Sequence, residues 1–350
     1  MTYIDKQFHR LLIIGNPGAE HVGAHFLDGA QQLGMEAQIV NVNEAWTGSK
    51  WFRRFCWHFV QKRPTALIAF SRKVLTACRR FQPDALLCTG VCPVAAQYLR
   101  EIGRLGIPRI NFLTDDPWNA KNGAGYFWKA LLEYDVVFTP RKSNIDDLIN
   151  HGCFQVKYLP FAYNPALHFY EPSITDQERR QFSCDAAIIG GADADRVPLA
   201  MSLVSAGFTI NLYGGYWDRT PALKPFWKGF VHDRQLRLAA CCATVNLCMG
   251  RRANRDGHAM RSFELPAMGA CMAVEDTPEH REIFGKEGDA VTYYASTSEM
   301  LSRVAYLKNH PQVAGRLAAR ARELITAGAN AYKDRFVSIL SHLKDTSARA

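Results

Sequence analysis

The feature that most constrains this chain is a repeated alternation of short apolar segments with helix-like ones. In the first half, five segments rich in apolar and β-branched residues are each followed by a stretch of helical pattern. These segments are residues 10–15, 37–42, 84–90, 109–116 and 135–140. Such alternation is typical of βαβ units, so it predicts a parallel sheet with helices on both faces.

The same alternation starts again in the second half, with strand candidates at residues 185–191, 208–215, 243–250 and 270–276. Residues 298–325 then predict two helices broken at Pro311, and residues 332–343 predict a last helix. A chain of 350 residues exceeds the usual size of one hydrophobic core. We therefore predict an α/β protein of two Rossmann-like domains whose parallel sheets face a cleft. The expected boundaries are 1–165, a polar linker at 166–184, 185–330, and a helix at 331–343 returning to the first domain.

Composition and charge indicate the compartment of the protein and the kind of partner it binds. No run approaches the roughly 20 apolar residues that span a bilayer, and the N-terminus shows no apolar core of a secretory signal. Ten cysteines without a zinc or disulfide spacing are typical of buried thiols in a reducing compartment. These features predict a cytoplasmic location. The formal net charge of +9 predicts an anionic partner: a phosphorylated ligand, an anionic lipid or nucleic acid.

Open α/β sheets bind ligands beyond the carboxyl ends of their strands. In the second domain, Gly190 and Gly191 follow the first strand, with Arg196 shortly after, and Gly214 and Gly215 follow the second. The third strand leads into "MGRRANRDGHAMRSFE", which carries four arginines and opens a helix. Backbone amides, a helix N-terminus and arginines together suit a diphosphate, although turns explain most single Gly-Gly pairs.

Several motifs of residues 185–335 carry a family resemblance: "IIGG" with the arginine after it, "LYGGYW", "VNLC", "RSFELPAMGACMAVED", "HREIFGKEGDAVTYYASTSEML" and "AYKDR". The segment resembles the donor domain of a GT-B glycosyltransferase, most closely the group-1 branch that includes the spore-maturation (CgeB-like) proteins. The first half resembles that family through its alternation and "TDDPWN".

In that superfamily an E-x7-E pair contacts the donor sugar and the ribose of the nucleotide. Glu264 matches the second Glu, and Asp256 stands at the first position, one methylene shorter. The resemblance thus implies ribose contact for Glu264 and leaves the sugar contact of Asp256 open. It also implies that Arg261 serves the diphosphate or orders the loop. The alternative is a helix-terminal Glu264 that simply pairs with Arg261.

Two more residues of the same loop are predicted to lie against the donor. Gly257 lies directly before the helix, and His258 has the best claim among the histidines because of its place in the phosphate loop. A lone histidine is otherwise more often structural.

In the first domain, Asp115 and Asp116 follow a buried strand. A carboxylate there suits a general base toward an acceptor hydroxyl, or stabilisation of an oxocarbenium ion. Asp116 before Pro117 is also a good helix start, so Asp115 is the favoured base. The loop "GNPGAEH" brings Gly15 and Gly18 to the expected acceptor side.

The resemblance implies a metal-independent, retaining transferase that needs no cofactor beyond its substrate, a UDP-, GDP- or dTDP-linked sugar. The acceptor would be a glycan, a lipid-linked molecule or a protein. The "DAD" at 193–195 has the D-x-D form of metal-dependent GT-A enzymes, but we predict no metal site there. A nucleotide-sugar epimerase of the same fold and a non-catalytic nucleotide-sugar-binding subunit are the alternatives. No G-x-G-x-x-G motif supports a dehydrogenase.

The segment from Trp51 to Pro64, "WFRRFCWHFVQKRP", mixes aromatic and basic residues. It suits peripheral contact with the anionic inner surface of a membrane, or an acceptor site with stacking rings. Base stacking is physically feasible, but no RNA-binding motif accompanies it, so nucleic acid is disfavoured. An amphipathic helix with a solvated basic face is the plain alternative.

Overall fold

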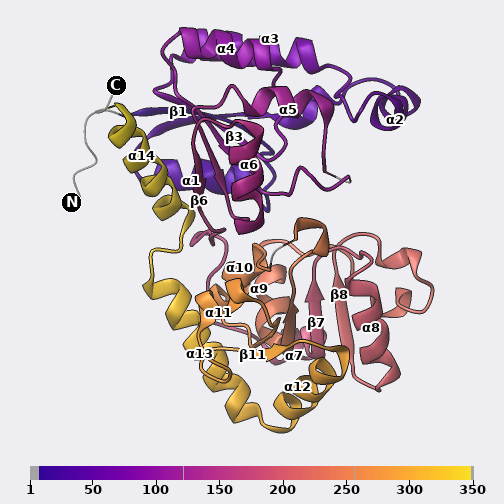
Figure 1. The fold of residues 1–350 in the computed structure, drawn as a ribbon. Helices are drawn as coiled ribbons and strands as arrows, with labels where there is room; N and C mark the ends of the chain where they lie inside the picture. Colours follow the sequence, from indigo (N-terminus) through magenta and orange to yellow (C-terminus); the bar gives the residue numbers. More distant parts are fainter. Residues whose placement is uncertain (1–7, 121, 256, 348–350) are drawn as a thin grey trace. The chain divides into compact units, whose positions relative to one another are not determined.

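The computed structural model describes residues 8–120, 122–255 and 257–347, and it divides into two compact units, each with its own parallel sheet (Figure 1). The first unit contains residues up to Pro160, together with Ala253–Arg255 and the residues from Tyr332 onward. The second contains Phe161–Arg252 and Asp256–Ala331. The α/β class with two parallel sheets, which the alternation predicted, is confirmed.

The first sheet has six strands in the order β2-β1-β3-β4-β5-β6, and every neighbouring pair is parallel. Its strands are β1 Arg10–Gly15, β2 Glu36–Asn41, β3 Ala85–Thr89, β4 Arg109–Phe112, β5 Val136–Thr139 and β6 Val156–Tyr158. The helices of this unit are α1 Val22–Gln32, α2 Lys50–Phe59, α3 Leu67–Phe81, α4 Ala96–Arg104, α5 Gly125–Leu131, α6 Ile145–His151 and α14 Tyr332–Ser347.

Both faces of the first sheet are covered, because alternate residues of a strand point to opposite faces. Leu12 and Ile14 of β1 belong to the core beneath α3, α4 and α5. On the other face α14 packs against α1, and the ring of Phe26 lies 5.1 Å from that of Tyr332 (Figure 1). Gly29 permits this approach, since a Cβ there would lie 2.9 Å from the backbone nitrogen of Lys333.

The second sheet has five parallel strands in the order β11-β10-β9-β7-β8. Its strands are β7 Cys184–Ile189, β8 Ile210–Tyr213, β9 Ala243–Cys248, β10 Met272–Glu275 and β11 Thr292–Tyr294. The helices are α7 Asp176–Phe182, α8 Arg196–Ser205, α9 Asp233–Cys242, α10 Arg261–Ala267, α11 Pro278–Phe284, α12 Thr297–Asn309 and α13 Pro311–Ala327. The predicted break at Pro311 is confirmed, since α13 begins there.

Three local features differ from the sequence predictions. Residues 166–184, predicted as a linker, contain α7 and pack in the second unit. Thr175 and Glu178 form a reciprocal capping box that starts this helix, a signal present in the sequence. The strands β6 and β11, three residues each, were not predicted because so short a segment gives no clear period.

The third difference concerns the residues after β4. No helix starts at Asp116 among the described residues there, and the next helix, α5, begins at Gly125. The Asp116 carboxylate instead accepts the N–H of Trp118 at 2.9 Å, which closes a turn. In the described part of the chain no helix is long and apolar enough to cross a membrane.

Candidate functional site

The second sheet has a topological switch point at its centre. The chain passes from β7 to β8 on one side, and β9 then pairs with β7 on the other side. Crossover connections leave from opposite sides of the sheet at such a point, so a crevice opens beyond the carboxyl ends of the two central strands. A ligand site is therefore expected at the residues that follow β7 and β9.

The two Gly-Gly turns of this edge pack directly on each other. Gly214 has a φ of +111°, and a Cβ on it would lie 2.8 Å from the carbonyl carbon of Gly190. A Cβ on Gly191 would lie 3.3 Å from the carbonyl oxygen of Gly215. Close packing of two strand ends is thus a sufficient reason for glycine at position 214.

Two indoles, the buried one of Trp217 and the half-buried one of Trp227, orient the peptides of these turns. Trp217 donates its Nε1–H to the carbonyl of Gly190 at 2.9 Å, and Trp227 donates to the carbonyl of Gly214 at 2.7 Å. In a trans peptide the following N–H points the opposite way. No acceptor in the described ranges bonds the N–H of Gly191 or Gly215. These two amides are therefore suited to bind an anion.

Arg196, the first residue of α8, is the most deeply placed cation of this edge. It is buried, donates to the carbonyl of Gly191 at 3.1 Å and pairs with Asp193 at 2.6 Å. Burial lowers the pKa of Arg196, and the charge of Asp193 opposes that shift. The guanidinium stays protonated, because even a lowered arginine pKa lies far above neutral pH.

The carboxylates of the "DAD" segment are engaged in local structure. Asp193 accepts the N–H groups of Asp195 at 3.1 Å and Arg196 at 2.9 Å, which caps the start of α8. Asp195 accepts the N–H of Arg252 at 3.2 Å. The segment thus holds the loop after β9 in place, a role that its D-x-D spacing did not indicate.

Glu275, the last residue of β10, steadies the same loop from the other side. Its carboxylate accepts the N–H of Gly250 at 3.1 Å. Burial raises the pKa of Glu275, while the Gly250 hydrogen bond and the charge of Arg252 act in the opposite direction. The side chains of Arg251 and Arg252 remain exposed beyond the strand end. Asp256, the other predicted donor contact of this loop, lies outside the described residues.

Arg261 and Glu264 lie at the head of α10. Arg261 donates its Nε–H to the carbonyl of Ile189, the last residue of β7, at 3.2 Å, and its Nη1 pairs with Glu264. The Glu264 side chain is only 2% exposed, whereas that of Arg261 is 24% exposed. The i, i+3 pair of the plain alternative is therefore present in the structure. The ribose contact of Glu264 remains a prediction.

A histidine that the sequence did not single out lies next to Glu264. His168 Nε2 is 3.9 Å from Glu264 Oε1, and its Nδ1 accepts the N–H of Asn164 at 3.0 Å. That bond places the ring proton on Nε2, facing the carboxylate. Burial first, and then the charges of Arg261 and Arg237, lower the pKa of His168 to about 3. His168 is therefore a neutral neighbour of Glu264 at physiological pH.

A second buried histidine fixes the start of α10. His280 Nδ1 lies 2.7 Å from the carbonyl of Glu275, and its Nε2 lies 2.9 Å from Ser262 Oγ. Ser262 Oγ in turn accepts the N–H of Ala259 at 3.1 Å. Burial lowers the pKa of His280 to about 4. No local pattern in the sequence indicates this network, because its members are separated in the chain and come together only in the fold.

Gly257 and His258 have structural surroundings. A Cβ on Gly257 would lie 2.4 Å from the Thr277 side chain, whose hydroxyl donates to the Gly257 carbonyl at 2.9 Å. His258 is fully buried, with its ring centroid 5.7 Å from that of Phe161 and 5.9 Å from that of Phe263. This burial favours the packing role of a lone histidine over donor contact.

In the first unit, Asp116 is buried and forms an ion pair with Arg255. Its backbone N–H donates to Asn254 Oδ1 at 3.1 Å, so Ala253–Arg255 are anchored within this unit. Arg255 also bonds Asp147 at 2.7 Å and has a φ of +61°. These bonds favour a structural role for Asp116 over that of a base.

Asp115 is half-buried at the same strand end. Thr114 donates its hydroxyl to Asp115 Oδ2 at 2.9 Å, and Asn144 donates to the Asp115 carbonyl at 3.3 Å. Of the two aspartates, it is the one whose carboxylate has no ion pair within the described residues. Asp115 therefore remains the predicted base.

The glycines predicted for the acceptor side also have packing reasons. A Cβ on Gly15 would lie 2.9 Å from Gly23 Cα, where β1 ends against α1. Gly18 donates its N–H to Asn16 Oδ1 at 2.9 Å, and its carbonyl accepts the N–H of His21 at 2.9 Å. Their position at the carboxyl end of β1 is compatible with an acceptor nearby.

Comparison with known proteins identifies structures that share this fold. A family described as "Glycosyl transferase-like" matches residues 198–341, which include most of the second unit and the first part of α14. Sucrose-phosphate synthase from Thermosynechococcus elongatus superposes with a TM-score of 0.68 at 10% identity, covering 98% of this chain and 100% of that one. Anabaena HepE, solved in complex with UDP and glucose, gives 0.64 at 12% identity, with coverage of 98% and 100%.

A further neighbour is a putative UDP-N-acetylglucosamine 2-epimerase from Listeria monocytogenes, with a TM-score of 0.55 at 12% identity and 97% coverage of both chains. No curated protein matches the sequence. At such low identities these similarities establish the fold alone. The protein has the GT-B glycosyltransferase fold, with two parallel α/β domains.

Proposed function

We propose that this protein is a glycosyltransferase that moves a sugar from a nucleotide-diphosphate sugar to an acceptor hydroxyl. The donor is a UDP-, GDP- or dTDP-linked sugar, and the acceptor is a glycan, a lipid-linked molecule or a protein. Transfer would proceed without a metal ion and with retention at the anomeric carbon. The CgeB-like branch is the proposed subfamily.

The observation that carries the proposal is the arrangement at the carboxyl ends of β7 and β8. The amides of Gly191 and Gly215 and the guanidiniums of Arg196 and Arg261 gather where an open α/β sheet binds its ligand. Glycosyl transfer develops negative charge on the departing diphosphate. Fixed amides and arginines stabilise that charge in the transition state more than in the ground state.

The other roles in the reaction are proposed from the positions of the residues in the fold and from the family resemblance. Asp115, at the carboxyl end of β4, is the proposed base, and Glu264 the proposed ribose contact. We also propose that the protein works in the cytoplasm as a peripheral protein on the anionic inner surface of a membrane. The basic aromatic segment from Trp51 to Pro64 would make this contact.

An epimerase is the second candidate, because a protein named as a putative UDP-N-acetylglucosamine 2-epimerase shares the fold. A non-catalytic sensor would bind the same ligands without turnover. Incubation with a labelled donor separates the three. Release of the nucleoside diphosphate or labelled acceptor indicates transfer, an isomeric sugar nucleotide indicates epimerisation, and an unchanged donor indicates sensing.

A thermal-shift panel of UDP-, GDP-, dTDP- and ADP-sugars tests the donor site. A ligand at a hundredfold excess over its dissociation constant stabilises the folded state by roughly 2.7 kcal/mol, which raises the melting temperature by several degrees. We expect one nucleotide to stabilise the wild type and Glu282→Gln, an exposed control on α11, but not Glu264→Gln. Failure of every nucleotide to stabilise the wild type would contradict the donor site.

A further inference from the structure

Helix α2 carries a stripe of exposed aromatic side chains. Trp51, Phe55 and Phe59 stand at positions i, i+4 and i+8, on one face of the helix. Their exposed fractions are 82%, 53% and 77%. The rings of Phe55 and Phe59 stack at 5.3 Å, so the stripe is continuous at that end. Figure 1 shows α2 at the edge of the first unit, outside the layers of α3 and α4.

Basic residues accompany the stripe. Lys50 and Arg54, one turn apart and exposed, run beside the aromatic face of α2. From Ala45 to Pro83 the sequence has nine basic residues and no Asp or Glu, and the formal net charge of the whole chain is +9. The nine are Lys50, Arg53, Arg54, Lys62, Arg63, Arg72, Lys73, Arg79 and Arg80. Five of the nine lie in α2 or directly after it, and the other four are on α3.

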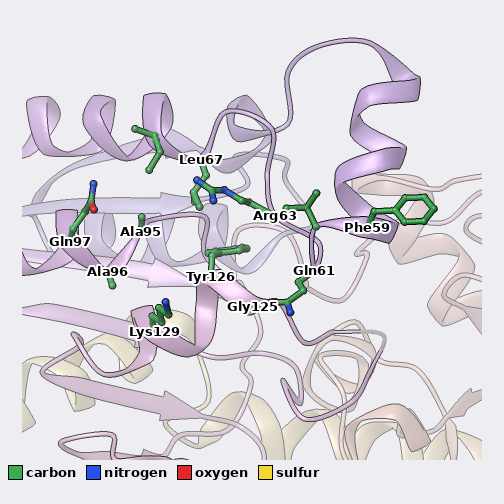
Figure 2. A pocket seen from close by; sticks show the side chains of 12 residues that line it. Phe59, Gln61, Arg63, Leu67, Ala95, Ala96, Gln97, Gly125, Tyr126 and Lys129 are labelled. Atoms are coloured by element: carbon green, nitrogen blue, oxygen red, sulfur yellow. The ribbon is translucent and has the colours of Figure 1, made fainter.

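A pocket begins where the aromatic stripe ends. It has a volume of about 510 Å³ and is lined by Phe59, Arg63, Tyr126 and Lys129 among others. Figure 2 shows Arg63 and Tyr126 in the middle of the lining, with Phe59 on one side and Lys129 and Gln97 on the other. Two cations over an apolar floor suit a ligand with an anionic head and an apolar body.

The position of this pocket in the fold suits a substrate. Its lining includes the first residues of α3, α4 and α5, namely Leu67, Ala96 and Gly125. The connections from β3 to α4 and from β4 to α5 start at the carboxyl ends of their strands. The pocket therefore lies at the N-terminal ends of three helices that cover one face of the first sheet, on the side where the strands end.

The rim between α2 and the pocket is held in an unfavourable backbone conformation. Gln61 and Lys62 have φ values of +47° and +55°, in the left-handed region that non-glycine residues avoid. The carbonyl of Gln61 accepts the N–H of Gly125 at 3.2 Å, and Lys62 donates to the carbonyl of Ala120. Such conformations persist where the surroundings enforce them, and they concentrate at functional sites.

We propose that the pocket binds the phosphate headgroup of an anionic membrane lipid, with the aromatic stripe of α2 lying in the bilayer interface. Arg63 and Lys129 face the phosphate, and Trp51, Phe55 and Phe59 contact the lipid chains. This proposal rests on the proposed function in one respect: if the protein is a glycosyltransferase, the lipid bound in the pocket is its acceptor. The stripe and the charge favour a bilayer over a free phosphate, which would need no exposed aromatic residues.

Flotation of the full chain with lipid vesicles tests the membrane part. We expect binding to phosphatidylcholine vesicles that contain phosphatidylglycerol, weakening as salt rises, and little binding to phosphatidylcholine alone. The triple variant Trp51→Ser, Phe55→Ser, Phe59→Ser should lose binding. Phe154→Ser, which removes another exposed aromatic residue of the first unit, should keep it. Equal binding to neutral vesicles, or full binding by the triple variant, overturns the proposal.

Two charge variants test the pocket itself. Arg63→Gln and Lys129→Gln should each lower vesicle partitioning by roughly fivefold, and Arg104→Gln, an exposed cation at the end of α4, should lower it less. Titration with a short-chain phosphatidic acid below its micelle concentration, followed by tryptophan fluorescence, should show the same ranking. Inorganic phosphate should bind far more weakly. If both pocket variants behave as the Arg104 variant does, the pocket is not the headgroup site.

Two other outcomes are distinct. Concentration-dependent dimerisation that the triple variant abolishes would show that the stripe joins two copies of the chain, and it overturns the proposal. The nucleotide-sugar thermal shift of the same variants should equal that of the wild type. If no sugar nucleotide shifts the melting temperature of the wild type, the proposed donor site is contradicted. The vesicle experiment then still tests the lipid site independently.

Discussion

Two basic regions of the described structure, the carboxyl edge of the second sheet and helix α2, are built in opposite ways. At the carboxyl edge of the second sheet, Arg196 and Arg261 are tied to backbone carbonyls and paired with Asp193 and Glu264. On α2, Lys50 and Arg54 are exposed beside aromatic side chains. The first arrangement fixes a few donors in place, whereas the second spreads charge over an open surface.

The difference indicates what each region can recognise. Fixed guanidiniums and oriented amides select a small ligand of defined shape, because their geometry is set before binding. A helix with exposed basic side chains and exposed rings matches an extended anionic surface. The two regions should therefore respond differently to mutation: the second-sheet edge in stability and nucleotide binding, and α2 in surface binding alone.

The largest effect is expected at Arg261. Arg261→Ala leaves the buried Glu264 carboxylate without its ion-pair partner, and loss of one member of a buried pair costs about 3–5 kcal/mol. Urea unfolding followed by fluorescence should show this loss in the second unit. Arg251→Ala is the matched control, since that side chain is 54% exposed, and we expect a change below about 0.5 kcal/mol. Equal effects of the two variants would contradict the buried pair.

The next largest effect is expected on the stability of the fold in acid, through the protonation of His280. Its pKa falls from 6.5 in the unfolded chain to about 4 in the fold because of burial. The unfolded state therefore binds the proton first as the pH falls. Stability is unaffected by His280 above pH 6.5 and decreases between pH 6.5 and 4, by roughly 3 kcal/mol in all.

Comparison of His280→Gln with the wild type tests this linkage. The variant should be less stable at pH 7, because the bonds to Ser262 and Glu275 are altered, but its loss of stability between pH 7 and 4 should be smaller. Unfolding free energies from urea titrations at four pH values measure the difference. Parallel pH profiles for the two proteins would exclude His280 as the titrating group.

A smaller effect is expected at the Gly-Gly turns. Gly214→Ala places a Cβ 2.8 Å from Gly190 at a φ of +111°, so strain and overlap together should cost about 2 kcal/mol and weaken nucleotide binding. Gly207→Ala isolates the strain, because its φ is +81° and its surroundings are open. Thermal unfolding should rank Gly214→Ala below Gly207→Ala, and the reverse order would contradict the close packing.

The smallest effect on stability is expected on α2. Trp51→Ser and Phe55→Ser remove side chains that contribute little to the core, so the unfolding free energy should change by less than about 0.5 kcal/mol. Urea unfolding is the measurement. A loss above roughly 2 kcal/mol would mean that the stripe packs within the fold, and the contrast between the two basic regions would fail.

Most of the fold follows from local pattern. Residues 10–15 and 243–248 are strands where alternation with helices predicted them, and α13 begins at Pro311 as expected. The order of the strands in each sheet cannot be predicted from local pattern, because the pairing of β7 with β9 depends on contacts between distant segments. The three-residue strands β6 and β11 and the capped helix α7 were missed, the last despite a readable capping box.

The candidate site could be predicted from the sequence only where its residues follow a strand or begin a helix. Gly190, Gly214 and Arg261 lie at strand ends and a helix start, which their sequence context indicated. The neighbours that give these residues their properties, such as His168 beside Glu264 and Trp217 against Gly190, are distant in the chain. Likewise Asp116 has an ion pair with Arg255 that no local pattern signalled.

Hydrogen exchange measured by mass spectrometry tests directly whether nucleotide-diphosphate sugars bind at the carboxyl edge of the second sheet. The full chain would be compared with and without the sugar nucleotide that gives the largest thermal shift. We expect slower exchange in residues 190–196, 214–217 and 249–264, with α2 unchanged. Protection confined to the first unit, or absent from all three segments under saturating ligand, would contradict binding at this edge.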